Sequence, residues 1–431
     1  MRAGDTIMAL SSGSLPAGVA VIRLSGPLVR QILDNVAGGV ATPRKMVLRH
    51  IGGEKRLDQG LVAFFPNPNS FTGEDCAELH GHGSPAGVKA ILSLLREEGA
   101  RLAEAGEFTR RAFENGKLDL LAVEGLGDLL TADTEKQRQQ ALARYDGKLS
   151  GEIDNWREAL LDLRAEIEAR LDFSDEGDVS ENLPEHWHIK LADLEIAIAG
   201  ALASVDSGRI VREGIRVALA GAPNAGKSSL INALARSDIA IVSDEAGTTR
   251  DVREVPLDIN GQLFILLDLA GLRETDSKAE AEGIRRAHQA MEQADVVLWL
   301  SAPDVEEIMP PNVTGRLLRI ATKTDMGTAN GQHDVAISVS TGEGLSDLVS
   351  KLSRIADGMV GGEPALVSHE RDRLALTEAL EALTETQQAL HDWELAAESL
   401  RRASAALERM IGRLDPEKIL DRLFSSFCIG K

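Results

Sequence analysis

The chain has few cysteines and no long apolar run. Its 431 residues include only two cysteines, Cys76 and Cys428, so no disulfide framework can support the fold. No run approaches the roughly 18 apolar residues that a membrane span requires. The N-terminus also lacks the sustained apolar core of a signal peptide. These absences predict a cytoplasmic protein without a membrane segment.

Aromatic residues are also scarce, at 3% of the chain, and the net charge is −21. Few aromatics disfavour recognition of single strands by base stacking, and the acidity argues against nonspecific binding to DNA. We therefore expect no DNA partner. Any contact with RNA would need a limited basic groove or a partner subunit.

The sequence pattern changes along the chain and divides it into four segments. Residues 1–117 mix strand-like runs with Gly, Pro and Asn turns, which predicts an α+β domain. Apolar residues recur at helical spacing in 118–210 and again in 368–431. Between them, 211–367 has apolar runs typical of a parallel sheet covered by helices. The sequence predicts a multidomain α/β and α protein, with a helical domain interrupted by an inserted α/β domain. The strands predicted in the insertion are 215–221, 263–271, 296–302, 317–323 and 335–340.

The segment GAPNAGKSS (221–229) follows a predicted strand and opens a predicted helix, the context that a P-loop requires. Gly221 and Gly226 permit the tight turn, where backbone N–H groups can surround phosphate oxygens. Lys227 would reach the β- and γ-phosphates, and the Ser228 hydroxyl would ligate Mg²⁺. A chance glycine turn is the alternative, but companion motifs argue against it.

Two of these motifs would serve the metal and the γ-phosphate. GTTRD (247–251) offers Thr249 as a second Mg²⁺ ligand. DLAG (268–271) offers Asp268 to hold Mg²⁺ through water and the Gly271 N–H to sense the γ-phosphate. The usual motif has Thr at the second position, here Leu, but that hydroxyl is not needed for the metal.

Two later motifs would recognise the base. In TKTD (322–325) the Asp325 carboxylate can accept from guanine N1–H and the 2-amino group, a donor pair that adenine lacks. The Lys323 stem would cover the base, and Ser338 belongs to the last base-side loop. The nucleotide is therefore predicted to be GTP. GTPases usually have Asn where Thr322 stands, so one base contact is expected to weaken.

The residue that activates water is not evident from these motifs. Leu272 stands where many small GTPases have the Gln that orients the attacking water. The acidic segment 274–282, which includes Glu280, offers substitutes, although a solvated helix start explains it equally well. Asn224 could ligate a monovalent cation beside the phosphates, or it could be a simple turn residue.

The chain closely resembles the MnmE (TrmE) family, bacterial GTPases that modify the wobble uridine of certain tRNAs. The resemblance covers essentially the whole chain. Beyond the nucleotide motifs it rests on PAGVAVIRLSGP (16–27), SFTGEDCAELHGHG (70–83), GEFTRRAFENGKLDL (106–120) and the terminal FCIGK (427–431). These stretches are far more specific than a P-loop, which many GTPases share.

The resemblance implies four parts: a folate-binding-like dimerisation domain (1–117), the two halves of a helical domain (118–210 and 368–431, ending in CIGK), and a Ras-like G domain (211–367). It also implies a GTPase activated by G-domain dimerisation, with K⁺ in place of an arginine finger and Glu280 orienting the water. The implied K⁺ ligands are Asn224, Ser243, Glu245 and Thr248. The implied GTP-binding residues are Asn224, Ala225, Gly226, Lys227, Ser228, Ser229, Ser243, Asp244, Glu245, Ala246, Gly247, Thr248, Thr249, Asp268, Leu269, Ala270, Gly271, Thr322, Lys323, Asp325 and Ser338.

For the N-terminal domain the resemblance implies a tetrahydrofolate derivative, 5-formyl- or methylene-tetrahydrofolate. Its ligands would be Arg23, Glu78, Lys117 and Lys431. Glu78 can accept from the pterin amino and ring N–H donors, while the cations answer acceptors or carboxylates. Without the resemblance, Glu78 with His80 and His82 could be read as metal ligands, but the spacing matches no zinc pattern.

The tail also acquires a role from the resemblance. Cys428 would be presented to the one-carbon unit or to the uridine, and Gly430 would permit the inward turn. The implied function is addition of a carboxymethylaminomethyl-type group at C5 of the wobble uridine. The chain would act as a homodimer in a heterotetramer with an FAD-dependent partner of MnmG (GidA) type. A regulatory or ribosome-assembly GTPase switch is the alternative, which the N-terminal motifs and the tail disfavour.

Overall fold

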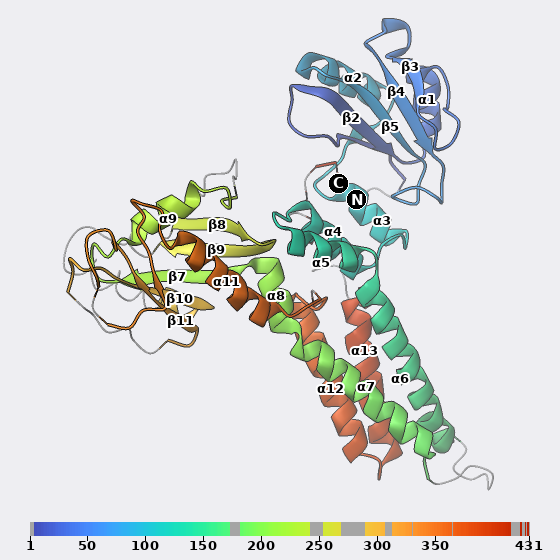
Figure 1. Cartoon of the computed structure of the whole chain (residues 1–431). Coiled ribbons are helices and arrows are strands. Elements are labelled where there is room, and N and C mark those ends of the chain that lie inside the picture. The colour runs from blue at the N-terminus through green and yellow to red at the C-terminus, as the bar shows by residue number, and fades with distance from the viewer. Residues whose placement is uncertain are drawn as a thin grey trace, which may run out of the picture. The chain divides into compact units, whose positions relative to one another are not determined.

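The chain forms two compact units, Met1–Gly127 with Leu407–Lys431 and Asp128–Ala406 (Figure 1). None of the described helices is long and apolar enough to cross a membrane. The computed structural model describes residues 4–172, 182–241, 253–268, 289–306, 313–329, 331–363, 365–414, 423–424, 427 and 429–430.

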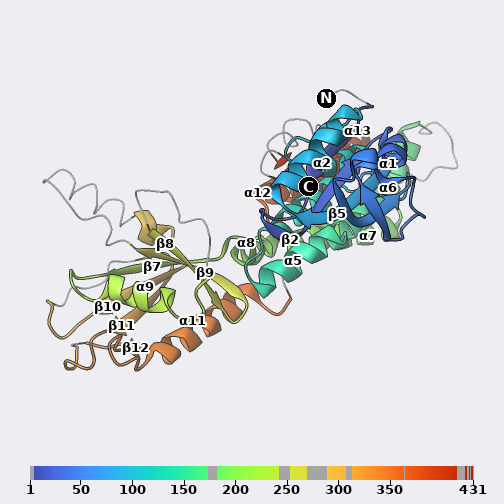
Figure 2. The same ribbon diagram turned by 90° about the horizontal axis from the view of Figure 1, so that it is seen from above.

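The first unit is built on a six-stranded sheet with the order β3-β4-β5-β2-β1-β6. Neighbouring strands are antiparallel except β1 and β6, which are parallel. Helices α1 and α2 pack against the sheet in one core (Figures 1 and 2). The elements are β1 (Ile7–Leu10), β2 (Ala17–Ser25), α1 (Val29–Ala37), β3 (Val47–Ile51), the 3₁₀ turn η1 (Gly53–Lys55), β4 (Asp58–Phe65), β5 (Cys76–Gly83), α2 (Pro85–Glu97), β6 (Arg101–Leu102), α3 (Glu107–Glu114) and α4 (Leu120–Leu130).

Strand alternation decides which side chains face away from this core. In β2, Ile22 and Leu24 are buried beneath α1 and α2. Because successive side chains of a strand point to opposite faces, Arg23 lies on the other face. There it pairs in register with Glu78 of β5. The sheet thus places this charged pair outside the apolar core.

The second unit contains a sheet with the order β12-β11-β10-β7-β9-β8, parallel except for β8 against β9. Helices α9 and α11 share the core of one face (Figure 2). The run of apolar side chains within each strand suits a sheet buried on both faces. The elements are β7 (Ile215–Gly221), α9 (Lys227–Ala235), β8 (Arg253–Ile259), β9 (Gln262–Asp268), β10 (Val296–Ser301), β11 (Arg316–Ala321), β12 (Val335–Ala336) and α11 (Leu345–Val360).

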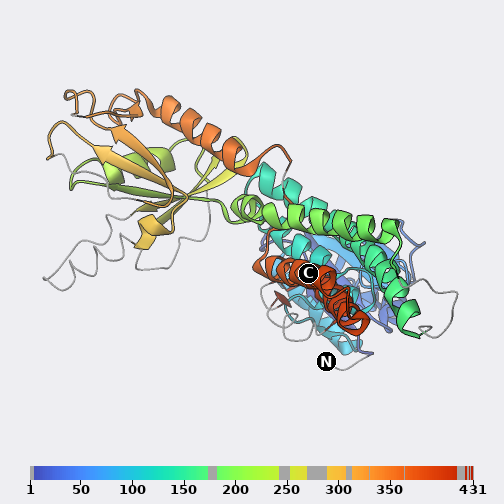
Figure 3. The same cartoon turned by 90° about the horizontal axis from the view of Figure 1, so that it is seen from below.

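The rest of the second unit is helical. Leu160, Leu163 and Ile167 are fully buried, which is the apolar stripe expected from their spacing. Helix α7 packs against both α6 and α12 (Figures 1 and 3). The helices are α5 (Glu135–Tyr145), α6 (Lys148–Asp172), α7 (Glu185–Ala203), α8 (Val205–Glu213), α12 (Glu370–Gln388) and α13 (Trp393–Met410), whose end lies past Ala406.

The chain enters and leaves the α/β part of this unit at neighbouring places. A Cβ on Gly208 of α8 would lie 2.1 Å from the Val367 carbonyl oxygen, so the two connections touch. The Gln140 side chain of α5 donates to the carbonyl oxygens of Gly208 (3.1 Å) and Ala365 (2.6 Å). Arg212 also donates to the Ser368 carbonyl oxygen at 3.1 Å. Helix α5 therefore holds both connections together.

The predicted fold class is confirmed, because an α+β domain, a helical domain and an inserted parallel α/β domain are all present. The strand predicted at 335–340 is wrong beyond Ala336. There the Ser338 N–H donates to the Glu343 carbonyl oxygen at 3.0 Å, which turns the chain away from the sheet. The domain boundaries at 117, 210 and 367 stay predictions.

Candidate functional site

The loop between β7 and α9 has the backbone of a phosphate-binding turn. Gly221 has a φ of 134°, and a Cβ there would lie 2.2 Å from the Leu300 carbonyl oxygen, so no side chain fits. Asn224 and Gly226 also have positive φ, at 63° and 93°. Gly226 is the N-cap of α9, so the positive end of that helix faces the loop. This geometry suits an anion held by backbone N–H groups.

Lys227 is held at the same loop. Its ammonium donates to the carbonyl oxygens of Gly221 and Ala222, each at 2.9 Å. Ser228 and Ser229 follow in the first turn of α9 and are exposed. A phosphate bound here would compete with these carbonyls for the Lys227 ammonium.

Asp268 lies near this loop at the end of β9. It pairs in register with Leu219 of β7, two residues before Gly221. Its side chain is 6% exposed. The carboxyl ends of parallel strands meet at one edge of a sheet, where α/β proteins bind their ligands. Asp268 and the P-loop therefore share that edge.

Thr322 ties the phosphate loop to the predicted base-recognition loop. It is 2% exposed, and its hydroxyl donates to the Ala225 carbonyl oxygen at 2.7 Å, with the Ser301 carbonyl oxygen at 3.1 Å. A threonine has one hydroxyl proton, so this donor is used within the protein. The structure gives Thr322 a positioning role between two loops.

The carboxylate predicted to recognise guanine is held by serines. The buried Ser338 hydroxyl donates to Asp325 Oδ1 at 2.6 Å and lies 2.9 Å from the Ser340 hydroxyl. Hydrogen bonds from Ser338 and Ser340 lower the pKa of Asp325, which keeps the carboxylate ionised and able to accept. This supports the acceptor role that the sequence predicts.

Lys323 beside it is oriented by Asp304. The Lys323 ammonium pairs with the Asp304 carboxylate at 2.6 Å, and this hydrogen bond lowers the pKa of Asp304. Lys323 also has a left-handed backbone, with φ at 54°. The ion pair fixes the direction of the lysine stem. The chemistry of the site thus includes a carboxylate that the motifs did not single out.

Much of the predicted G-domain site lies outside the described residues. Glu280, the predicted water-orienting residue, is one of these. Cys428 and Lys431 of the C-terminal tail, which belong to the predicted folate site, also lie outside the described residues. The same is true of Ser243, Asp244, Glu245, Ala246, Gly247, Thr248, Thr249, Leu269, Ala270 and Gly271. Their predicted roles stay predictions.

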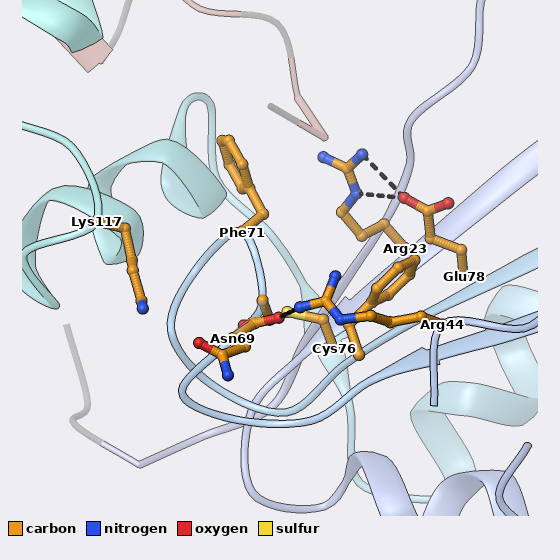
Figure 4. A pocket seen from close by; sticks show the side chains of 9 residues that line it. Arg23, Arg44, Asn69, Phe71, Cys76, Glu78 and Lys117 are labelled. Atoms are coloured by element: carbon orange, nitrogen blue, oxygen red, sulfur yellow. Dashed lines mark hydrogen bonds and ion pairs between the residues drawn. The ribbon is translucent and has the colours of Figure 1, made fainter. Parts of the chain in front are cut away.

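A second candidate site is a cavity of about 500 Å³ on the sheet of the first unit (Figure 4). Arg23 donates from Nε and Nη2 to Glu78 Oε1 at 3.2 and 3.0 Å. Lys117 lines the same cavity, so three predicted folate residues meet in one place. The lining residues are Arg23, Arg44, Phe65, Asn69, Ser70, Phe71, Cys76, Glu78 and Lys117.

Glu78 is an ionised acceptor in this cavity. Burial would raise the pKa of Glu78, but a hydrogen bond from His80 and the charge of Arg23 outweigh it and lower the pKa. His80 Nε2 lies 3.0 Å from Glu78 Oε2. His82 instead pairs with Asp58, at 2.7 Å. Within the described part of the chain, no cluster of three His, Cys, Asp or Glu side chains is arranged for a metal ion.

The C-terminal tail contacts the same unit. Ile429 forms an antiparallel bridge with Ala105, and the Ser11 hydroxyl donates to the Gly430 carbonyl oxygen at 3.0 Å. Gly430 has a φ of 101°, and a Cβ there would lie 2.6 Å from the Leu10 carbonyl oxygen. The described residues directly after position 428 are therefore seated against the N-terminal part of this unit.

The tail and the cavity share their neighbours. A Cβ on Gly106 would lie 2.8 Å from the carbonyl oxygen of Phe424 in the tail. Two residues further on, the Phe108 ring centre lies 5.8 Å from the Arg23 guanidinium. Segment 105–108 thus contacts the tail at one end and a cavity residue at the other.

Three residues at these sites were missed from the sequence: Asp304, Ser340 and Arg44. Asp304 follows the end of a predicted strand, and that position in a parallel sheet is a signal that could have found it. Ser340 stands two residues after Ser338 in the base-side motif. Nothing in the sequence pattern marks Arg44, which precedes β3 in an unremarkable turn.

Comparison with known families assigns both parts of the chain. A family model described as "GTP-binding protein TrmE N-terminus" matches residues 6–117, and one described as "MnmE helical domain" matches residues 120–428. The G domain of the T. maritima FeoB iron transporter is 26% identical, covering 33% of this chain and 98% of that chain, with a TM-score of 0.23. Because that TM-score is low, the assignment rests on the sequence matches.

Full-length relatives agree with the family models. The tRNA modification GTPase MnmE of Azorhizobium caulinodans is 50% identical over 436 residues, covering 100% of both chains. That of Rhizobium meliloti is 48% identical, also covering 100% of both, and that of Rhizobium johnstonii is 47% identical, covering 99% of both. The chain belongs to the MnmE family of tRNA modification GTPases.

Proposed function

We propose that this chain hydrolyses GTP to drive a conformational cycle in the modification of tRNA. With an FAD-dependent partner of MnmG type, it adds a carboxymethylaminomethyl-type group at C5 of the wobble uridine of certain tRNAs. The observation that carries the proposal is the contact of Ile429 and Gly430 with the N-terminal domain at Ala105 and Ser11. A regulatory GTPase switch needs no chain end seated on another domain, so this contact favours the enzyme.

The proposed GTP site uses the loop at 221–229 for the phosphates and Asp325 for guanine. Mg²⁺ prefers oxygen ligands. Ser228, Asp268 and Thr249 would hold it. When bound, Mg²⁺ offsets the negative charge that develops at the phosphates. Lys227 would bind the phosphates, and Glu280 would orient the attacking water.

The proposed K⁺ site supplies a second positive charge beside the phosphates. Asn224 lies in the exposed part of the loop, where its side chain is accessible to a nucleotide and its cation. Backbone or side-chain oxygens of Ser243, Glu245 and Thr248 would complete the ligand set. Dimerisation of the G domains would close this site. GTPase rates measured in KCl and NaCl test the proposal, since equal rates would exclude a specific K⁺ ligand set.

The N-terminal cavity is proposed to hold 5-formyl- or methylene-tetrahydrofolate. Glu78 can accept hydrogen bonds from a ligand, while Arg23 and Lys117 can donate them. The cavity therefore offers both acceptors and donors to a polar ring. Lys431 would add a fourth contact, and Cys428 would face the one-carbon unit or the uridine. A homodimer and a heterotetramer with the FAD-dependent partner, acting in the cytoplasm, complete the proposal.

Mass spectrometry of nucleosides from total tRNA tests this function. We would compare cells with the intact gene, a deletion, Cys428→Ser, and Ile429→Val as a matched control beside the cysteine. Loss of the C5-modified wobble uridine in the deletion and in Cys428→Ser, but not in Ile429→Val, is expected. Unchanged uridine in the deletion would leave the GTPase switch as the better function.

A further inference from the structure

The N-terminal cavity is lined by three cations, of which one is neutralised. Arg23 pairs with Glu78, whose second oxygen lies against His80. Arg44, from the segment that precedes β3, and Lys117, from the segment that follows α3, line the cavity from different sides (Figure 4). Among the residues that the structure describes, neither of these two cations forms an ion pair. Arg44 and Lys117 therefore bring uncompensated positive charge to the cavity.

The two carboxylates directly before the lining residue Cys76 are committed elsewhere. Glu74 accepts from Arg111 at 3.0 Å and from the Ser25 hydroxyl at 2.6 Å. Asp75 pairs with Arg30 at 2.7 Å, and its other oxygen accepts from the Asn67 N–H at 2.9 Å. Both acids point into the fold, so neither is available to Arg44.

Arg44 is nonetheless held in place. Its backbone N–H donates to the Phe64 carbonyl oxygen at 2.9 Å, and one guanidinium nitrogen donates to the Asn69 carbonyl oxygen. The guanidinium also lies 6.0 Å from the centre of the Phe65 ring. A guanidinium has five N–H donors in a fork, so most of them stay available to a ligand.

The surrounding unit has a charge balance unlike that of the whole chain. Residues 1–117 contain 14 Lys and Arg against 12 Asp and Glu, whereas the net charge of all 431 residues is −21. An anionic ligand is therefore repelled less at this cavity than elsewhere on the molecule.

We propose that Arg44 is an anion-binding residue of the cavity and takes a carboxylate of the ligand's tail. The ligand class is then a flat, hydrogen-bonding ring with an acylglutamate tail, the ring at Glu78 and the tail carboxylate at Arg44. Phe65 and Phe71 supply apolar walls of the cavity. This inference rests on the proposed folate site and assigns it a further specificity residue.

Calorimetric titration of the full-length protein tests the role of Arg44. The two probes are 5-formyltetrahydrofolate and 5-formyltetrahydropteroate, which lacks the glutamate. We expect Arg44→Gln to bind the folate about tenfold more weakly and the pteroate unchanged, because a half-exposed charge-assisted pair is lost only for the former. Arg44→Lys keeps the charge and should lie between. Lys45→Gln, the neighbouring cation that does not line the cavity, is the matched control.

Each result decides the matter. Arg44→Gln that weakens both probes equally, or neither, overturns the tail contact while the folate site itself stands. An intact protein that binds neither probe overturns the folate site and the role of Arg44 together. A tenfold loss in Lys45→Gln would replace a specific contact with general electrostatics and would also overturn the proposal.

Discussion

At the scale of single residues, Thr322 shows how one hydroxyl can serve where most GTPases have an amide. The hydroxyl proton of Thr322 is donated to the Ala225 carbonyl oxygen in the phosphate loop. Thr322 therefore joins two loops, and side-chain discrimination of guanine falls to Asp325. The weaker base contact expected from this residue is compatible with an intact link between the loops.

Thr322→Val tests this link. Valine keeps the shape but leaves the buried Ala225 carbonyl without this donor, at a cost of about 1–2 kcal/mol. We expect GDP and GTP to dissociate several-fold faster, measured by stopped flow with a fluorescent nucleotide. Thr324→Val is the control, because its hydroxyl has no hydrogen-bond partner among the described residues. Equal dissociation rates in both variants would contradict the role of Thr322.

At the scale of elements, α5 is secured by a buried ion pair. Arg144 on α5 donates to Asp372 on α12 at 2.8 Å, and both side chains are fully buried. It also donates to the Leu366 carbonyl oxygen at 2.5 Å. Burial would raise the pKa of Asp372, but the charges of Arg144, Arg371 and His369 outweigh it and lower the pKa. The pair joins α5 to the start of α12 beside one connection of the insertion.

Asp372→Asn should destabilise the second unit by about 3–5 kcal/mol, because it leaves a buried cation without its carboxylate. Glu385→Gln removes half of an even shorter ion pair, with Arg402 at 2.5 Å, but both partners are exposed. That variant should cost less than about 1 kcal/mol. All four tryptophans lie in the second unit, so their fluorescence during urea unfolding reports both effects. Similar urea midpoints for the two variants would show that burial is not decisive here.

At the scale of the whole molecule, the first unit contains a network of charges around the buried carboxylate of Glu107. Glu107, with its side chain 1% exposed, accepts from Arg101 and Arg111, which also pair with Asp5. Burial would raise the pKa of Glu107, but these hydrogen bonds and charges lower it. Asp5, Asp75 and Glu78 in the same unit also have lowered pKa values.

A carboxylate with a lowered pKa stabilises the fold above its ordinary value, 4.5 for Glu107, and loses that contribution as the pH falls toward the lowered value. We therefore expect the first unit to lose stability below about pH 4.5. Glu107→Gln should lower its stability at pH 7 by about 2 kcal/mol and flatten this dependence. Hydrogen exchange of peptides from residues 4–127 measures both.

Glu114→Gln is the control for this variant, since Glu114 forms an exposed pair on the same helix. It should change neither the stability nor its dependence on pH. An unchanged acid response in Glu107→Gln would mean that the network does not determine acid stability.

How far the sequence predicts the structure differs between elements and sites. Strands β7, β9, β10 and β11 and the apolar stripe of α6 follow from periodicity, because buried faces repeat with each element's own geometry. The Arg144–Asp372 pair could not be predicted, since its partners are 228 residues apart and no local pattern links them. Arg44 was missed for the same reason.

The motifs at the sites were informative because phosphate turns and base contacts constrain neighbouring residues. They identified Lys227 and Asp325, but not Asp304, which becomes a neighbour of Lys323 only after folding. They also did not anticipate where the Thr322 hydroxyl points. Local spacing predicts which residues are present at a site, whereas the contacts between loops depend on the assembled sheet.

The touching connections at Gly208 and Val367 have a topological consequence. The two connections between the G domain and the helical domain lie side by side. The G domain is therefore an insertion, and the helical domain continues past it without a gap. A graft that replaces the domain would join chain segments that are in contact at Gly208 and Val367. A G domain taken from a relative should therefore fit the same two attachment points on the helical domain.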